Sequence, residues 1–72
     1  MNERLQILFM QTRLLRLARE EWHLTLKDAN RLYCDNGVYR YIADLWGLFH
    51  VEGDDAVFDE IKTYLKRRGV TI

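Results

Sequence analysis

The chain has 72 residues and no formal net charge, because eleven basic residues balance eleven acidic ones. This length provides one small domain, close to the lower limit at which a core is stable without disulfides or metals. Hydrophobic residues make up 49% of the chain, which is typical of a globular protein and excludes a disordered one. The balanced charge provides no overall attraction to nucleic acid or to an acidic membrane surface.

Proline and glycine, the residues that most often form turns and end helices, are few in this chain, and this favours helices. The chain has no proline and four glycines, which is too few for a series of strand turns. Cys34 is the single cysteine, so we expect no disulfide framework, a reducing cytoplasmic location and a small buried side chain. The apolar stretch "LQILFMQTRLL" is interrupted by polar residues and is shorter than the roughly 20 residues of a membrane span. We therefore expect no membrane segment.

The first segment predicts a helix over residues 2–22. Leu8, Leu15 and Trp22 recur every seven residues, and Leu14 and Ala18 fill the same side at helical spacing. We expect this side to face the core. A further set of apolar side chains makes the arc wider than one neighbouring helix would need: Ile7, Met10 and Leu17.

The next segment predicts a helix over residues 25–36. Thr25 is a candidate N-cap, and Asp28 places a carboxylate near the free amides of the first turn. Asn36-Gly37 is also a hairpin signal, but apolar residues continue beyond it at helical spacing. We therefore interpret Gly37 as the left-handed residue that ends this helix.

Two more helices complete the predicted fold. The spacing of Val38, Ile42, Leu45, Trp46 and Phe49 predicts a helix over residues 38–49. A last helix over residues 54–68 would begin with Asp54 as its N-cap and end at Gly69. His50 and Gly53 are the candidate turn residues between these two helices. The prediction is an all-α, single-domain bundle of four helices spanning residues 1–72.

The sequence has few features of catalysis. The only histidines, His23 and His50, have no second ligand at the helical spacing that a zinc site requires, and phosphate-binding loops are absent. The acidic stretch "EGDDAVFDE" lacks the ligand pattern of an EF-hand loop. We therefore expect no enzyme activity, no metal site and no cofactor.

Surplus apolar surface favours a binding role instead. A small four-helix domain buries one stripe of each helix, and exposed large side chains promote association with a protein partner or with a second copy. The candidate interface residues are Ile7, Met10, Leu14, Leu17, Tyr39 and Tyr41. The alternative is a helix-turn-helix regulator that reads DNA with Tyr39, Arg40 and Tyr41, although the neutral charge makes nucleic acid the less favoured partner.

The order of three stretches carries a family resemblance: "HLTLKDANRLYCDNGVYRYI", "LWGLFHVEG" and "DEIKTYL". In this order the chain resembles a family of short bacterial all-helical proteins of unknown function. The resemblance covers about two-thirds of the chain. Members are often encoded beside a protein that is similar to ADP-ribosyltransferase toxins. The resemblance implies an antitoxin or a partner subunit, and it assigns no catalytic residue.

Overall fold

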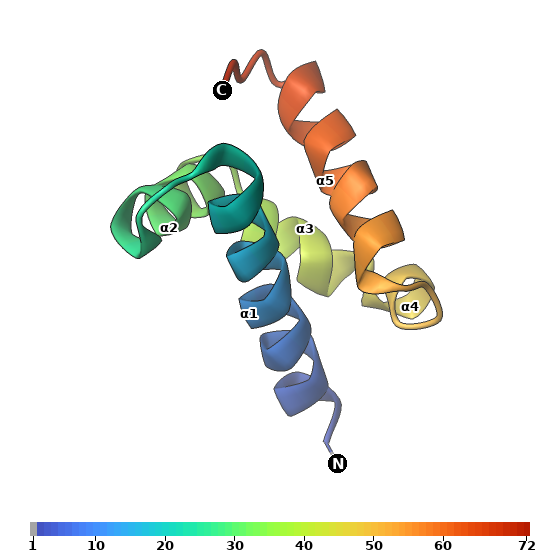
Figure 1. Ribbon diagram of the computed structural model, residues 1–72. Coiled ribbons are helices and arrows are strands. Elements are labelled where there is room, and N and C mark those ends of the chain that lie inside the picture. The colour runs from blue at the N-terminus through green and yellow to red at the C-terminus, as the bar shows by residue number, and fades with distance from the viewer. Residues whose placement is uncertain (1) are drawn as a thin grey trace.

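The structure is a computed structural model that describes residues 2–72, and over those residues it is all-helical, as predicted. Its five helices are α1 (Glu3–Trp22), α2 (Leu26–Asp35), α3 (Val38–Asp44), α4 (Trp46–Phe49) and α5 (Asp54–Arg67) (Figure 1). The radius of gyration is 11.5 Å, close to the roughly 11 Å of a compact domain of this length. The prediction of a small helical bundle is confirmed.

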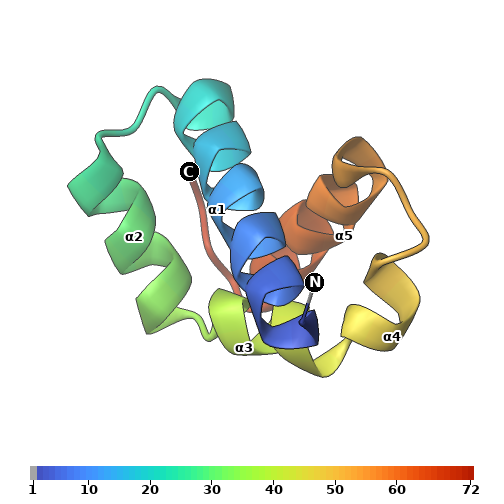
Figure 2. The same ribbon diagram turned by 90° about the horizontal axis from the view of Figure 1, so that it is seen from below.

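The longest helix, α1, is the centre of the packing. It contacts α2, α3 and α5, and Figure 2 shows it lying between α2 and α5. The side of α1 that enters the core presents Met10, Leu14 and Ala18, each at most 2% exposed and spaced four residues apart. Residues at this spacing lie above one another on one face of a helix. Ala18, which has the smallest of these three side chains, is fully buried.

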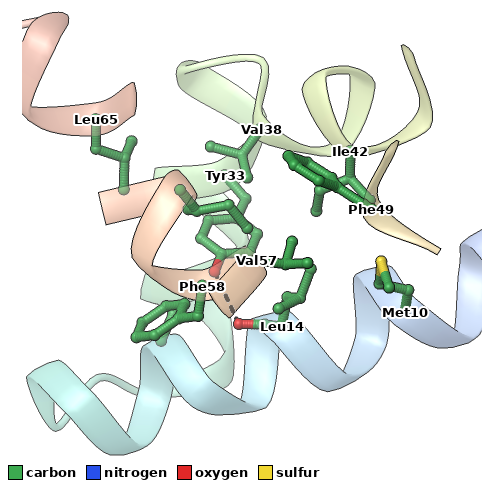
Figure 3. Packing of buried hydrophobic residues seen from close by; sticks show 11 residues of the cluster. Met10, Leu14, Tyr33, Val38, Ile42, Phe49, Val57, Phe58 and Leu65 are labelled. Carbon is green, nitrogen blue, oxygen red and sulfur yellow. Dashed lines mark hydrogen bonds between the residues drawn. The ribbon is translucent and has the colours of Figure 1, made fainter. Parts of the chain in front are cut away.

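Tyr33 of α2 makes a buried polar contact in the core. Its hydroxyl donates a hydrogen bond of 2.7 Å to the carbonyl oxygen of Leu14 (Figure 3). Burial, followed by the neighbouring Tyr39, raises the pKa of the Tyr33 hydroxyl well above its ordinary value, so this donor keeps its proton. Among the described residues, every buried side-chain nitrogen or oxygen has a hydrogen-bond partner.

Local signals define the ends of the first two helices. Thr25 caps α2 as predicted, because its side chain accepts a hydrogen bond from the backbone N–H of Asp28 at 3.1 Å. Gly37 has the predicted left-handed backbone, with φ of 67°, between α2 and α3. The end of α1 was not predicted in this form: His23 adopts φ of 52°, a left-handed conformation that is uncommon for a residue with a side chain.

The prediction of one helix over residues 38–49 is wrong. The chain leaves helical geometry at Leu45, with φ of −101° and ψ of 13°, and this break separates α3 from α4. Phe49 is 3% exposed in the core, whereas Leu48 is 64% exposed. The change of direction at Leu45 therefore lets α4 place Phe49 in the core, although the apolar spacing is compatible with a continuous helix. His50 follows α4, and its ring Nδ1 lies 2.9 Å from the carbonyl oxygen of Trp46.

The prediction that Asp54 caps α5 is also wrong. Gly53 occupies the N-cap position, with φ of −75°, and Asp54 is the first helical residue. The Asp54 carboxylate accepts hydrogen bonds from Arg13 of α1, at 2.7 Å from Nε and 3.3 Å from Nη2. A planar guanidinium matches a carboxylate in this two-bond geometry. The carboxylate therefore joins α5 to α1 instead of capping its own helix.

We expect Gly37→Ala to lower the free energy of unfolding by about 1–2 kcal/mol, because a side chain is strained at this positive φ. Gly47→Ala is the matched control. Gly47 lies within α4, and an added Cβ would meet nothing within 4 Å, so this variant should be up to about 1 kcal/mol more stable. Urea denaturation followed by circular dichroism measures both. If Gly37→Ala and Gly47→Ala changed the free energy of unfolding by the same amount in the same direction, the left-handed role of Gly37 would be contradicted.

We expect Tyr33→Phe to cost about 1 kcal/mol at neutral pH through loss of the hydrogen bond to Leu14. The folded-state pKa of Tyr33 is raised, so its hydroxyl stabilises the fold below pH 10 and progressively less above it. The difference in stability between wild type and Tyr33→Phe should therefore stay constant up to about pH 9 and shrink as the pH rises above about 10. Urea denaturation at several pH values checks this. A difference that grows with pH would contradict the assignment.

Candidate functional site

The exposed side of α1 is apolar over its first half. Leu5, Leu8 and Phe9 are 45%, 52% and 45% exposed, and they lie on the opposite side of the helix from Met10 and Leu14. Single exposed apolar residues are common on protein surfaces, but a contiguous group on one helix face is typical of an interaction surface. This face is therefore the starting point of the candidate site.

The apolar face continues into a groove beside α1. An open pocket of about 370 Å³ lies between α1 and α3 and is lined by Leu8, Gln11, Thr12, Leu15 and Tyr39. A second pocket, of about 240 Å³, lies between α1 and the start of α2. Its lining repeats Thr12 and Leu15 and adds Arg16, Arg19 and Leu26. Since the two pockets share Thr12 and Leu15, they adjoin one another along α1, and we call them together the α1–α2 groove.

Hydrogen bonds fix the floor of the α1–α2 groove. Gln11 of α1 donates from Nε2 to the carbonyl oxygen of Tyr39 at 2.9 Å. The Tyr39 hydroxyl donates to Oδ1 of Asn30 in α2 at 2.8 Å, and its ring packs edge-on against Tyr33 with centroids 5.5 Å apart. Burial, followed by the nearby Cys34, raises the pKa of the Tyr39 hydroxyl, which keeps it a donor. Tyr39 thus joins three helices and is held in one position.

The charged side chains that line the groove are all positive and lie at one end of it. Arg16 and Arg19 at its α2 end are the charged side chains in its lining, and neither has a carboxylate partner in the described ion pairs. Arg19 makes only a long contact of 3.5 Å from Nε to the carbonyl oxygen of Leu24. The acidic first turn of α5 belongs to the other side of α1, where Asp54 binds Arg13. The groove is therefore an apolar surface with an unpaired cationic end.

The residues that the sequence assigned to an interface divide into two groups. Met10 and Leu14 were assigned wrongly, because both lie in the core at 2% and 0% exposure. The other four side chains are half-buried, and three of them pack against the core: Ile7, Leu17, Tyr39 and Tyr41. Tyr39 alone of the six lines the groove.

The exposed apolar residues of the candidate site that were not predicted are Leu5, Leu8, Phe9 and Leu26. The polar residues around Leu8 on the helix could have shown that it lies outside the core. Thr12, Arg16 and Arg19 share its side of α1 at helical spacing, and a face that contains two arginines is a poor candidate for burial.

The three residues of the DNA-binding alternative, Tyr39, Arg40 and Tyr41, lie in α3, and their side chains differ in exposure. Arg40 is exposed and lies 3.8 Å from Asp44 on the same helix. Tyr41 stacks on Tyr64 with ring centroids 4.2 Å apart, and Tyr39 is engaged in the groove floor. Arg40 is therefore the most exposed of the three, and DNA binding stays a prediction.

The other chemically active side chains are dispersed. Cys34 is exposed, so the prediction of a buried cysteine is wrong; it lies on the outer side of α2 near Asn30. Over residues 2–72, no group of three or more histidine, cysteine, aspartate or glutamate side chains could hold a metal ion. Within the same range, α1 is the longest helix, and neither it nor any other is long and apolar enough to span a membrane.

A comparison with protein families places most of the chain in one family. The family described as "Protein of unknown function (DUF3791)" matches residues 9–68, a range that includes all of the groove except Leu8. The predicted resemblance to a family of unknown function is confirmed at that level. No curated protein and no solved structure matches the chain.

We expect Leu8→Asp to leave the free energy of unfolding within about 0.5 kcal/mol of wild type, because Leu8 lies outside the core. Met10→Asp, two residues away on the buried side, should cost more than about 3 kcal/mol by placing a carboxylate among apolar side chains. Thermal and urea denaturation of the two variants check the assignment. Comparable losses in both would show that Leu8 belongs to the core.

Proposed function

The chain belongs to the DUF3791 family of proteins of unknown function, and within that family we propose that it is a non-enzymatic protein–protein interaction module. The observation that carries this proposal is the apolar face formed by Leu5, Leu8 and Phe9, which runs into the α1–α2 groove. A core that closes without these side chains leaves them available to a partner. These three side chains are about half exposed, and burying the remaining apolar surface against a partner favours association.

The proposed partner is a bacterial toxin-like enzyme, which the module neutralises or accompanies as a subunit. The resemblance to a family encoded beside proteins similar to ADP-ribosyltransferases motivates this choice. The mechanism is steric: the apolar face of α1 covers a surface of the enzyme, and arginines at its rim set the orientation. No residue of this chain takes part in a reaction under this proposal.

Co-expression with the product of the adjacent gene tests the proposal. We expect a complex that elutes as one species in size-exclusion chromatography, and we expect Leu8→Asp to weaken it at least tenfold by placing a charge in the apolar contact. Leu48→Asp is the matched control, since Leu48 is 64% exposed but belongs to α4, away from the groove. Isothermal titration calorimetry measures the dissociation constants.

Separate elution of the two wild-type proteins would overturn the proposal. Equal weakening by Leu8→Asp and Leu48→Asp would remove α1 as the contact surface, because a specific interface distinguishes two exposed leucines on different helices.

A further inference from the structure

We propose that the α1–α2 groove takes an amphipathic helix of another protein, with apolar residues against Leu8, Leu15 and Leu26 and carboxylates against Arg16 and Arg19. This inference rests on the proposed function and specifies the kind of partner element. Three features of the groove support it: its shape, its apolar lining and its cationic end.

The shape of the groove favours a helix. Its lining on α1 extends from Leu8 to Arg19, eleven residues apart, which corresponds to about 16 Å or three helical turns. The depression lies between α1 on one side and α2 with α3 on the other, and side chains of a third helix fit between two packed helices as ridges into grooves. The described chain has no strand, so an extended peptide has no sheet edge to join.

The charge of the groove identifies the complementary sequence. The lining contains two arginines and no carboxylate, and the described ion pairs leave both arginines without an acidic partner. Guanidinium groups bind carboxylates through paired hydrogen bonds, and removing both groups from water strengthens their attraction. A partner helix with glutamate or aspartate at the end that lies over Arg16 and Arg19 therefore completes the site.

The same charge argues against a second copy as the occupant. The groove of a second copy has the same lining, with Arg16 and Arg19 and no carboxylate. A symmetric groove-to-groove contact would therefore supply no carboxylate from the lining to pair with these arginines, and the like charges of the two copies would oppose association. The exposed residues of α5 in a second copy are acidic at one end but present no apolar stripe, since its apolar side chains are in the core.

Synthetic helical peptides of about 14 residues, or four turns, provide a direct test. The probe has leucines at positions i, i+4, i+7 and i+11, two glutamates at one end of the same face, and a lactam bridge on the outer face that holds the helix. A second peptide replaces both glutamates with lysine. We expect the glutamate peptide to bind at least tenfold more tightly in fluorescence anisotropy, with NMR shift changes confined to α1, the start of α2 and Tyr39.

Reversal of charge in the protein separates a specific site from general attraction. We expect Arg16→Glu with Arg19→Glu to invert the preference, so that the lysine peptide binds more tightly. Lys66→Glu with Arg67→Glu changes the net charge by the same amount on α5, which lies on the other side of α1 from α2 (Figure 2), and should leave the preference unchanged. Circular dichroism establishes that each double variant is folded.

Several outcomes would overturn the inference: equal binding of the two peptides, no binding of either at about 1 mM, or no inversion in the Arg16 and Arg19 variant. A dimer in analytical ultracentrifugation that Leu8→Asp dissociates would also overturn the inference. So would binding of duplex DNA that depends on Arg16 and Arg19. The proposed function is tested separately. A complex with the adjacent gene product that tolerates the Arg16 and Arg19 reversal would retain the function and exclude this groove as its site.

Discussion

The position of α1 between three other helices is the constraint on which the rest of the structure depends. Its buried stripe of Met10, Leu14 and Ala18 supplies the centre of the core, and the Leu14 carbonyl accepts the hydrogen bond of Tyr33. Two further contacts tie the same helix to α5 through Arg13 and to α3 through Gln11. A helix enclosed on three sides still has a fourth, and the side chains on that fourth side make up the candidate site.

The all-helical fold and several helix ends follow from interactions between residues close in sequence, so the sequence was sufficient to predict them. A threonine that caps a helix and a glycine that accepts positive φ act over three or four residues, and Thr25 and Gly37 have the predicted roles. The break at Leu45 depends instead on where the core admits Phe49, and the role of Asp54 depends on Arg13, 41 residues away. Contacts of this kind are absent from any local pattern.

The candidate site was only partly predictable for the same reason. An interface on α1 was inferred from its surplus of apolar residues, but the assignment of faces was wrong where two stripes compete. Leu8, in the seven-residue repeat, is 52% exposed, whereas Met10, Leu14 and Ala18, four residues apart, are buried, and apolar spacing alone does not distinguish the two stripes. Tyr39 was identified as an interface residue, whereas its role in joining α1, α2 and α3 depends on the tertiary arrangement.

The separation of the two faces of α1 has an evolutionary consequence. Substitutions on the buried stripe change the stability of the whole domain, so selection acts on them in every descendant. Substitutions at Leu5, Leu8 or Arg16 change the free energy of unfolding much less, since these side chains stand outside the core. Substitutions can therefore accumulate along one side of one helix while the architecture is inherited unchanged.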